Sequence, residues 1–552
     1  MIKTKQICAA VIAFCMIFAF IPMAAFAENP YKGFCGENLT WEYDETAKKL
    51  TISGTGNMSN YYSSSIAGSR APWVNSKIKT EIETVVISDG VTSIGENAFF
   101  ECTSLKNVTI PSSVRTINEG AFYYCEALTG IKIPESVTSI GDSAFSYCKG
   151  LTGVTIPGSV VSIGDSVFDS CDSLTGITIL NGVKSIGNYA FSWCKSLINI
   201  SIPDSVVSIG YEILYGATYS GDESNWENNV LYIGNHLIKA NSISGEYAVK
   251  PGTKSIADCA FYCCSELTGI ILPESMAGIG NRAFDNCSEL ISMEIPENVI
   301  RIGDYAFKAC PHLTDINVVA DNPAFCSENG VLYNKEKTEI VRFPQGKPDT
   351  RFSIPNGVTS IANGAFADCW QLTGVIMNGV TSIGNEAFNT CSALTSITIP
   401  DGVSIISNRA FYNCESLKNV TIPNSVLFID KEAFDKCSIR KVNYIGSDAD
   451  WNEVEIGTGN NALTKVGITL IGGVSAKCFA DGKIVVKPIN IAAGKTVILA
   501  LYDGDKLVGM QPETYKGTEI TLIPAQNYTR AKVMVWESFE GMSPVCDFKI
   551  IK

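Results

Sequence analysis

The chain has 552 residues, a formal net charge of −14 and 20 cysteines. An acidic chain of this kind is a poor partner for nucleic acid or for anionic cell-wall polymers, which are also negatively charged. Its length is enough for several ordinary domains or for one long array.

The N-terminus has the pattern of a secretory signal peptide, which we place at residues 1–27. Lys3 and Lys5 form a short basic start, residues 7–21 are uncharged and apolar, and small residues lie at the end of this segment. The apolar run is too short for a comfortable membrane span. We therefore expect cleavage, export and no membrane span afterwards. Removing the two lysines, the only charged residues of the segment, changes the net charge from −14 to −16.

Residues 28–80 precede the regular part of the chain and are predicted to form an N-terminal cap. Residues 38–43 and 49–54 alternate apolar and polar side chains around a polar turn, which predicts a β-hairpin. A solenoid needs a terminal unit that covers its first core face, and this segment is suited to that role.

Residues 81–471 repeat a unit of about 23 residues, so they are predicted to form a solenoid of stacked coils. In one unit, residues 105–110 alternate as a short strand and Val114 and Ile117 form a second inward pair. The spacing from Ala121 to Cys125 predicts one turn of α- or 3₁₀-helix that closes the coil. A recurring glycine before this turn predicts a bend with positive φ; it is found at Gly95, Gly141, Gly164 and Gly187.

Two repeat positions predict a structural role in the core. One is a phenylalanine, as at Phe122 and Phe145, and the other is a cysteine three residues later. The cysteines of the first coils are Cys102, Cys125, Cys148, Cys171 and Cys194. Coils about 4.8 Å apart bring such cysteines within disulfide range by distance. Because stacked side chains point the same way, we expect mostly reduced thiols that pack as small apolar residues.

The array is interrupted by two related insertions, near residues 216–250 and 320–355. Each contains Val-Leu-Tyr, a polar turn and a second alternating run, which predicts a hairpin standing out from the stack. Residues 444–471 are predicted to be the closing unit. Residues 472–552 contain six or seven short alternating segments and are predicted to form a small C-terminal β-sandwich, with Cys478 and Cys546 as its candidate disulfide.

Units such as residues 128–148 resemble the BspA-like leucine-rich repeats of bacterial surface proteins, and the resemblance extends over about residues 34–470. It implies a β-rich α/β solenoid, a right-handed curved array of short strands and helical turns. It also implies a secreted or cell-surface protein that acts in adhesion, with a host or microbial surface protein or glycan as its partner. We expect a monomer. The family carries no catalytic motif, so no catalytic residue is transferred.

Catalytic and metal sites are not indicated by the remaining residues. The only histidines, His236 and His312, lack a recognisable nucleophile setting. Cys259, Cys263 and Cys264 cluster, but they lack the further ligands of a tetrahedral zinc site. We therefore expect no enzyme, no cofactor and no metal.

Binding is the better prediction, and two surfaces are candidates. The outward strand positions are Thr109, Lys132, Thr155 and Thr178. The aromatic residues beside the phenylalanine column include Tyr123, Tyr124, Tyr147, Trp193 and Tyr262. Aromatic rings give large contact areas at low entropic cost. The alternatives are that threonine simply suits an exposed strand and that the rings are partly buried.

Three hypotheses follow for the function. The first is a non-catalytic binding protein whose ligand contacts spread over several coils. The second is a structural spacer that displays the C-terminal domain. The third is an enzyme with its site in the C-terminal module or in a hairpin.

Overall fold

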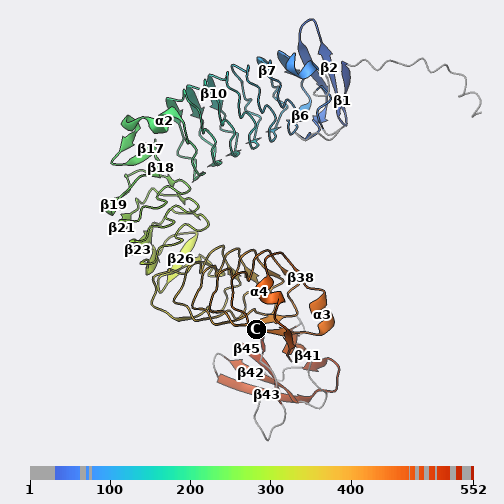
Figure 1. The fold of residues 1–552 in the computed structure, drawn as a ribbon, viewed down its shortest axis with the longest axis vertical. Helices are drawn as coiled ribbons and strands as arrows, with labels where there is room; N and C mark the ends of the chain where they lie inside the picture. The colour runs from blue at the N-terminus through green and yellow to red at the C-terminus, as the bar shows by residue number, and fades with distance from the viewer. Residues whose placement is uncertain are drawn as a thin grey trace, which may run out of the picture. The chain divides into compact units, whose positions relative to one another are not determined.

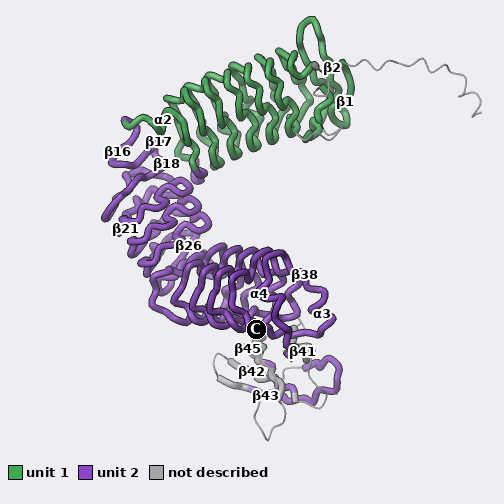
Figure 2. Tube along the Cα trace, viewed as in Figure 1, with its two compact units in different colours: residues 1–205, 212–223 green, residues 206–211, 224–552 purple. Residues whose placement is uncertain are grey.

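The computed structural model describes residues 31–62, 70–73, 77–471, 473–478, 484–489, 496–503, 506–522, 530–536 and 549–551. The predicted signal peptide and Cys546 lie outside these residues, as does the side chain of Cys478. The chain divides into two compact units, residues 1–205 with 212–223 and residues 206–211 with 224–552, which Figure 2 distinguishes by colour.

Unit 1 is a stack of coils in which most coils contribute short parallel strands to two ladders; the coil around Lys132 contributes only to the second (Figure 1). In both ladders each residue pairs with the residue one repeat unit later: Thr155 pairs with Thr178, and Ile163 pairs with Ile186. The first strands are β5 (Thr84–Ile87), β7 (Asn107–Thr109), β10 (Gly153–Ile156), β12 (Gly176–Ile179) and β14 (Asn199–Ser201). The second strands are β6 (Val91–Ile94), β8 (Thr116–Ile117), β9 (Ser139–Ile140), β11 (Ser162–Ile163) and β13 (Ser185–Ile186).

Unit 2 continues the same plan. Its first strands are β19 (Gly245–Ala248), β21 (Leu267–Ile271), β23 (Ser292–Ile295), β25 (Asp315–Val318), β29 (Arg351–Ser353), β31 (Gly374–Ile376), β33 (Ser396–Thr398), β35 (Asn419–Pro423), β37 (Lys441–Ile445) and β39 (Ile468–Leu470). Its second strands are β15 (Ser208–Ile209), β20 (Ser255–Ile256), β22 (Gly278–Ile279), β24 (Arg301–Ile302), β30 (Ser360–Ile361), β32 (Ser382–Ile383), β34 (Ile405–Ile406), β36 (Phe428–Ile429) and β38 (Glu455–Ile456).

The core is built from columns of identical side chains. The rings of Phe122 and Phe145 stack with centroids 5.3 Å apart and planes 3° apart, and both rings are fully buried. The cysteine column lies beside them and is also buried. Cys148 Sγ lies 3.3 Å from the Phe122 carbonyl oxygen of the preceding coil, and Cys171 Sγ lies 3.2 Å from that of Phe145. The thiols are thus placed to donate to these carbonyls, and the described cysteines form no disulfide with one another.

The turn that carries these columns differs from the helical turn predicted for it. In the coil of Phe145, Ser143 and Tyr147 have positive φ angles of 54° and 59°. Alternate amides bond within the turn, as from Cys148 N to Phe145 O (3.2 Å). The amides between them donate to the next coil, as from Phe145 N to Val167 O (2.9 Å). In a helix the backbone amides would bond within the helix itself. The left-handed residues instead turn alternate amides toward the next coil, so the turns of successive coils can pair.

The prediction of positive φ at the recurring glycine is wrong. Gly95, Gly141, Gly164 and Gly187 are absent from the positive-φ residues, which lie two positions later in the described coils. Glycine is required there for space. A Cβ on Gly141 would lie 2.6 Å from Glu119 N, and one on Gly95 would lie 1.9 Å from Ser59 O. At these glycines the coils approach each other too closely for a side chain, whereas other coils hold Asn118, Ala257 or Ser407 at the same repeat position.

The N-terminal segment contains the predicted hairpin. It comprises β1 (Lys32–Gly36), β2 (Leu39–Asp44), β3 (Lys49–Gly54), β4 (Gly56–Asn57) and the 3₁₀ helix η2 (Lys77–Thr80). Strands β2 and β3 pair antiparallel, and β3 pairs parallel with β5 of the array. The buried Trp73 stacks on Phe99 at 5.6 Å, so its indole lies at the start of the phenylalanine column.

Both predicted hairpins are present, but they do not stand out from the stack. The first comprises β16 (Trp226–Glu227), β17 (Val230–Ile233) and β18 (His236–Ala240), preceded by α2 (Thr218–Gly221) and η3 (Glu223–Asn225). The second comprises β26 (Phe325–Glu328), β27 (Val331–Asn334) and β28 (Glu339–Arg342). The last strand of each hairpin pairs parallel with the next coil, β18 with β20 and β28 with β30. Each insertion therefore replaces part of a coil, because its apolar side chains complete the core.

The array continues to β39, after the short helices α3 (Asp448–Asn452) and α4 (Asn461–Thr464). Two antiparallel sheets follow. One contains β40 (Gly473–Cys478), β41 (Ile484–Ile489) and β44 (Ile520–Leu522). The other contains β43 (Lys506–Thr514), β42 (Thr496–Asp503), β45 (Arg530–Trp536) and β46 (Lys549–Ile551). A sandwich of these two sheets stays a prediction.

Candidate binding surface

Two residues follow the buried phenylalanine in the turn of each coil; the first is outward in some coils, as at Tyr123, and buried in others, as at Ser146 and Ser192. The second of them has a left-handed backbone, with φ of 65° at Tyr124, 59° at Tyr147 and 54° at Trp193. Left-handed residues with large side chains are uncommon in proteins. Here the requirement comes from the pairing of successive turns, so a left-handed residue recurs at the same position of successive coils.

Four of these outward side chains in unit 1 form a continuous surface, which we call the aromatic ridge: Phe100, Tyr123, Tyr124 and Tyr147. Phe100 stacks on Tyr123 at 5.4 Å with planes 7° apart, and Tyr124 stacks on Tyr147 at 4.8 Å with planes 18° apart. Tyr123 also contacts Tyr147 at 5.6 Å. All four are only partly buried. Burial raises the pKa of Tyr123, and its tyrosine neighbours and Asp169 add to this effect, so its phenol stays neutral at physiological pH.

Trp193 lies two coils beyond Tyr147 and is 46% exposed. It meets Tyr215 edge to face, with centroids 5.4 Å apart and planes 90° apart. A Cβ on Gly216 would come within 2.6–3.0 Å of three adjacent indole atoms of Trp193, so the indole lies flat on the Gly216 backbone. Only glycine at this position leaves room for that packing.

The coil between Tyr147 and Trp193 is polar at the same turn. Asp169 and Ser170 occupy its two outward positions. Ser170 Oγ donates to Asp169 Oδ2 at 3.1 Å, and the buried Ser192 hydroxyl donates to Asp169 Oδ1. The aromatic surface of unit 1 is thus two groups of rings with a fixed carboxylate between them.

Lysines at the rim of this surface are paired with carboxylates. Lys149 Nζ lies 2.6 Å from Glu126 Oε1 and 5.5 Å from the centroid of the Tyr124 ring. Lys195 Nζ lies 3.0 Å from Asp172 Oδ1. Exposed pairs of this kind add little stability, but they leave neither lysine as an unpaired cation at the rim.

The other predicted surface is exposed as expected but is less continuous. Thr109, Lys132, Thr155 and Thr178 are all exposed. Thr155 and Thr178 lie side by side on β10 and β12, whereas Thr109 belongs to the separate sheet of β7, and Lys132 lies outside the strands. Tyr262, 52% exposed, lies in unit 2 and is not part of the ridge.

The profile of the BspA type leucine rich repeat region matches this chain over residues 77–180, 161–244, 240–347 and 342–453. These matches join into one stretch that covers more than half of the chain. The chain belongs to the BspA-type leucine-rich-repeat family. That membership confirms the resemblance noted in the repeat sequence.

Among solved structures, BspA-type coils of this chain are similar to a leucine rich cell surface protein from Faecalibacterium prausnitzii. The identity is 26%, the match covers 78% of this chain and 98% of that one, and the TM-score is 0.35. A leucine-rich repeat protein from Bacteroides ovatus is 22% identical, over 79% of this chain and 99% of that one, with a TM-score of 0.29. One from Eubacterium ventriosum is 20% identical, over 79% and 95%, with a TM-score of 0.28. Comparison with curated proteins finds no match.

A groove of about 630 Å³ lies on the strand face of the BspA-type array in unit 2, and the sequence reasoning missed it. It is lined by β29, β31 and β33, and it coincides with a break in the ladder, since β31 and β33 belong to different sheets. Ile376 is 56% exposed in this groove. The signal was present in the sequence: the repeat around residues 377–379 is one residue short.

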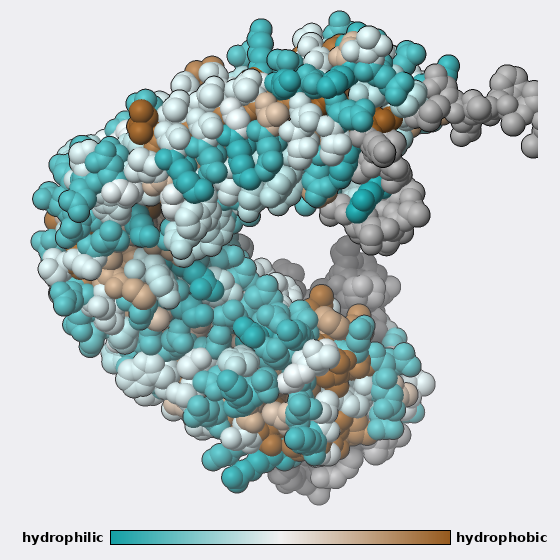
Figure 3. Space-filling model, turned by 45° about the horizontal axis from the view of Figure 1, so that its top comes forward, coloured by the Kyte–Doolittle hydropathy of each residue, from teal (hydrophilic) through white to brown (hydrophobic). Residues whose placement is uncertain are grey.

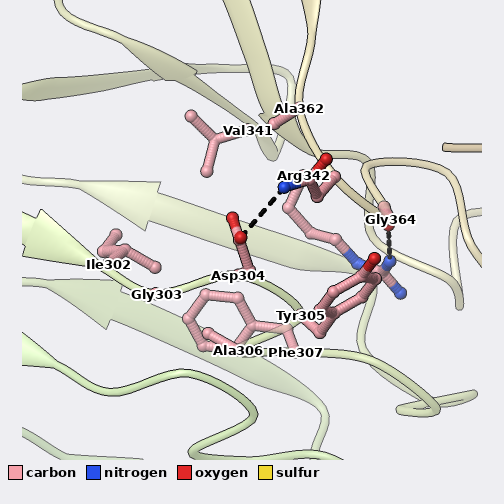
Figure 4. A pocket seen from close by; sticks show the side chains of 11 residues that line it. Ile302, Gly303, Asp304, Tyr305, Ala306, Phe307, Val341, Arg342, Ala362 and Gly364 are labelled. Carbon is pink, nitrogen blue, oxygen red and sulfur yellow. Dashed lines mark hydrogen bonds between the residues drawn. The ribbon is translucent and has the colours of Figure 1, made fainter. Parts of the chain in front are cut away.

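A second pocket in unit 2, of about 30 Å³, lies where the second hairpin rejoins the array (Figure 4). Arg342 and Tyr305 both line it. Arg342 is 3% exposed, and its Nη1 donates to Gly364 O at 2.6 Å, while its Nε and Nη2 lack a partner among the described residues. Burial raises the pKa of the nearby carboxyls of Asp285 and Asp368. This cluster is charged and buried, and it offers no open surface.

One unexpected contact bears on the prediction that the chain has no catalytic site. His236 Nδ1 lies 2.8 Å from Ser255 Oγ, a pair that sequence spacing did not suggest. Both residues are fully buried between β18 and β20, so no substrate can reach them. His312 is exposed and bonds to the Ser288 carbonyl. No group of three metal-ligating side chains occurs in the part of the chain that the structure describes.

The surface has two further general features. On the face drawn in Figure 3, most side chains are hydrophilic, and the apolar ones gather mainly toward the lower right. None of the helices within the described ranges combines the length and the apolar character needed to cross a bilayer.

Proposed function

We propose that this chain is an exported, cell-surface or secreted binding protein without catalytic activity, and that it recognises a surface protein or glycan through the aromatic ridge of unit 1. One observation carries the proposal. Phe100, Tyr123, Tyr124 and Tyr147 place four contacting rings on the outside of three consecutive coils, although the fold requires no ring at any of these positions, only a left-handed backbone at Tyr124 and Tyr147. Serine fills the same turn position at Ser170.

The energetics of such a surface suit recognition. Rings already held by their neighbours lose little conformational entropy when a partner covers them. Aromatic residues are also enriched among the side chains that dominate binding energy. The threonine row offers no comparable cluster, since only Thr155 and Thr178 of its members share a sheet.

The organisation we propose supports this role. Residues 28–80 act as the cap, because Trp73 covers Phe99 at the first coil. Residues 81–471 form the binding array, and residues 472–552 form a small β-sandwich built from the two C-terminal sheets.

The test is a comparison of two triple variants on an array of glycans and matrix proteins. The ridge variant changes Tyr123, Tyr124 and Tyr147 to serine, a residue that the chain itself uses at these turn positions, so the fold should be kept. The control variant changes Thr109, Thr155 and Thr178 to alanine. We expect the ridge variant to lose at least about tenfold in affinity, as the loss of one or two stacked rings predicts, and the control to bind as the native chain does. Loss of binding in the threonine variant alone would contradict the proposal.

A further inference from the structure

The aromatic surface of unit 1 has a gap that is one coil wide. On four consecutive coils the second outward position of the turn is Tyr124, Tyr147, Ser170 and Trp193, and all four have the same left-handed backbone. The backbone therefore repeats without interruption, while one large side chain is missing. A ring at Ser170 would continue the stack that Tyr124 and Tyr147 begin.

The rings on both sides present their faces to this gap. Tyr124 and Tyr147 stack along the direction in which the coils repeat, so one face of Tyr147 lies on Tyr124 and the other points toward the coil of Ser170. The indole of Trp193 lies flat on Gly216, the matching residue of the following coil. Its opposite face therefore also points toward Ser170. Two aromatic walls enclose a slot above a small side chain.

The slot has room for one ring, and a thick ring fills it better than a planar one. Two coil steps of about 4.8 Å separate the walls by about 10 Å. A planar ring needs about 3.5 Å to each wall, or about 7 Å in total. A saturated six-membered ring in a chair form is thicker, because its axial hydrogens project from both faces. Those hydrogens carry partial positive charge and meet the negative face of an aromatic ring.

The floor and rim of the slot favour a neutral ligand rich in hydroxyl groups. The Asp169 carboxylate is held in place by the hydroxyls of Ser170 and Ser192, and it can accept further hydrogen bonds. Its negative charge disfavours an anionic ligand. Lys149 and Lys195 are already paired with Glu126 and Asp172, so they do not offset that charge.

We infer that the slot between Tyr147 and Trp193 binds one neutral pyranose unit of a glycan. One face of the sugar stacks on each aromatic wall, and a sugar hydroxyl donates to Asp169. This inference rests on the proposed function, since it names the ligand class of the same surface, and it adds Ser170 and Trp193 to the binding residues.

The experiment is saturation-transfer NMR on the full chain with the methyl glycosides of glucose, galactose, mannose and N-acetylglucosamine. N-Acetyltryptophanamide and adenosine serve as planar competitors. We expect at least one glycoside to receive saturation at its ring C–H groups and to be displaced by its free sugar, but not by the planar compounds. Transfer to none of the glycosides, or preferential binding of a planar compound, would overturn the inference.

The decisive variant is Ser170→Tyr, which fills the slot with a residue that the chain already places at Tyr124 and Tyr147 with the same backbone. The matched control is Thr390→Tyr, at the same turn position of a coil in unit 2, where φ is 57°. We expect Ser170→Tyr to lose glycoside binding at least tenfold with an unchanged unfolding temperature, and Thr390→Tyr to bind normally. Unchanged binding in a folded Ser170→Tyr variant would contradict the slot.

This inference and the proposed function fail in different ways. If Ser170→Tyr binds glycosides and array ligands normally while the serine ridge variant does not, the slot is wrong and the ridge stands. If the serine ridge variant retains all array binding, the ridge is wrong whatever the glycosides do. Loss of both activities in Ser170→Tyr supports the two together.

Discussion

The same repeat is used in two contrasting ways by the coils around Phe145 in unit 1 and by the junction around Arg342 in unit 2. In the first region the buried positions hold rings, aliphatic side chains and thiols, and the thiols are placed to donate to the phenylalanine carbonyls. In the second, the hairpin strand β28 ends with the buried guanidinium of Arg342, in which only Nη1 has a partner among the residues that the structure describes. The unusual residues of unit 1 face outward, whereas those of the junction face inward.

The contrast shows where a solenoid tolerates variation. An outward position after the phenylalanine has no core to satisfy, so it accepts rings, serine or glycine while the backbone stays the same. At an inward position every buried polar atom needs a hydrogen-bond partner. Within the described part of the chain the junction at Arg342 leaves such atoms unpaired, so we expect its coils to be less stable than those around Phe145 and more sensitive to pH.

The largest effect is expected from Phe145→Ala. Removing this ring takes from Phe122 and Phe168 one of the two rings that each stacks on, at 5.3 and 5.4 Å. A buried phenylalanine costs about 3–5 kcal/mol when it is cut to alanine. Because each coil contacts only its neighbours, the loss should be local. Hydrogen exchange should show faster opening of the coils around residue 145 and little change in unit 2.

The control for this variant is Tyr147→Ser, two residues away on the outside of the same turn. It should cost less than about 1 kcal/mol, since it removes a partly exposed ring and leaves the core intact. Equal destabilisation by the two changes would mean that the ridge is part of the core.

The second prediction concerns Arg342→Met. Removing the guanidinium leaves the Asp285 and Asp368 carboxyls without one of the cations that favour their charged forms. We expect a loss of about 3 kcal/mol at pH 7, typical of breaking a buried charge cluster. Burial already raises the pKa of Asp368 above its ordinary value of 3.8. The folded state therefore loses stability relative to the unfolded state as the pH rises above that value and the carboxyl ionises. The penalty should be largest at neutral pH and should shrink as the pH falls toward 4.

Chemical denaturation at pH 7 and pH 4.5, followed by hydrogen exchange in β28 and β30, measures this effect. Arg301→Met is the matched control, because Arg301 is only partly buried and also donates to a carbonyl, at 3.4 Å. It should change stability by no more than about 0.5 kcal/mol. If the loss of stability in Arg342→Met does not depend on pH, the guanidinium does not influence the ionisation of the Asp285 and Asp368 carboxyls.

Much of this fold could be predicted from the repeat, because a fixed period gives every coil the same pattern of apolar and polar residues. The columns of Phe145 and Cys148 follow directly from it. The turn conformation was missed, since a spacing of three or four residues is shared by a helix and by successive turns with left-handed residues such as Ser143. For the same reason the glycine at Gly141 was explained by a positive φ angle and not by the close approach of the next coil. A recurring glycine can have either cause, and the sequence does not distinguish them.

The site was predicted less well than the fold. Tyr123, Tyr124 and Tyr147 were found because they recur beside the phenylalanine, and the structure brings them together. Tyr262 was selected on the same pattern but lies in the other unit. The slot at Ser170 was missed because it depends on a missing side chain, and a serine among aromatic residues carries no signal until the rings beside it are placed.

The smallest effect is expected from the cysteine column, where Cys148→Ala and Cys148→Ser separate apolar packing from hydrogen bonding. Alanine removes both the sulfur volume and the donor to Phe122 O, at a cost of about 1 kcal/mol. Serine keeps a hydrogen-bond donor in place. It should therefore lower the stability less than alanine does if the bond matters, and more than alanine does if only apolar volume matters.

Burial raises the pKa of the Cys148 thiol to about 12. Between the ordinary thiol pKa of 9.0 and this value only the unfolded chain ionises, so stability falls as the pH rises, by about 1.4 kcal/mol per pH unit for each such thiol. Both variants should therefore show a shallower loss between pH 9 and pH 11 than the native chain. An identical slope would mean that Cys148 is already ionised or bonded to another cysteine in the native array.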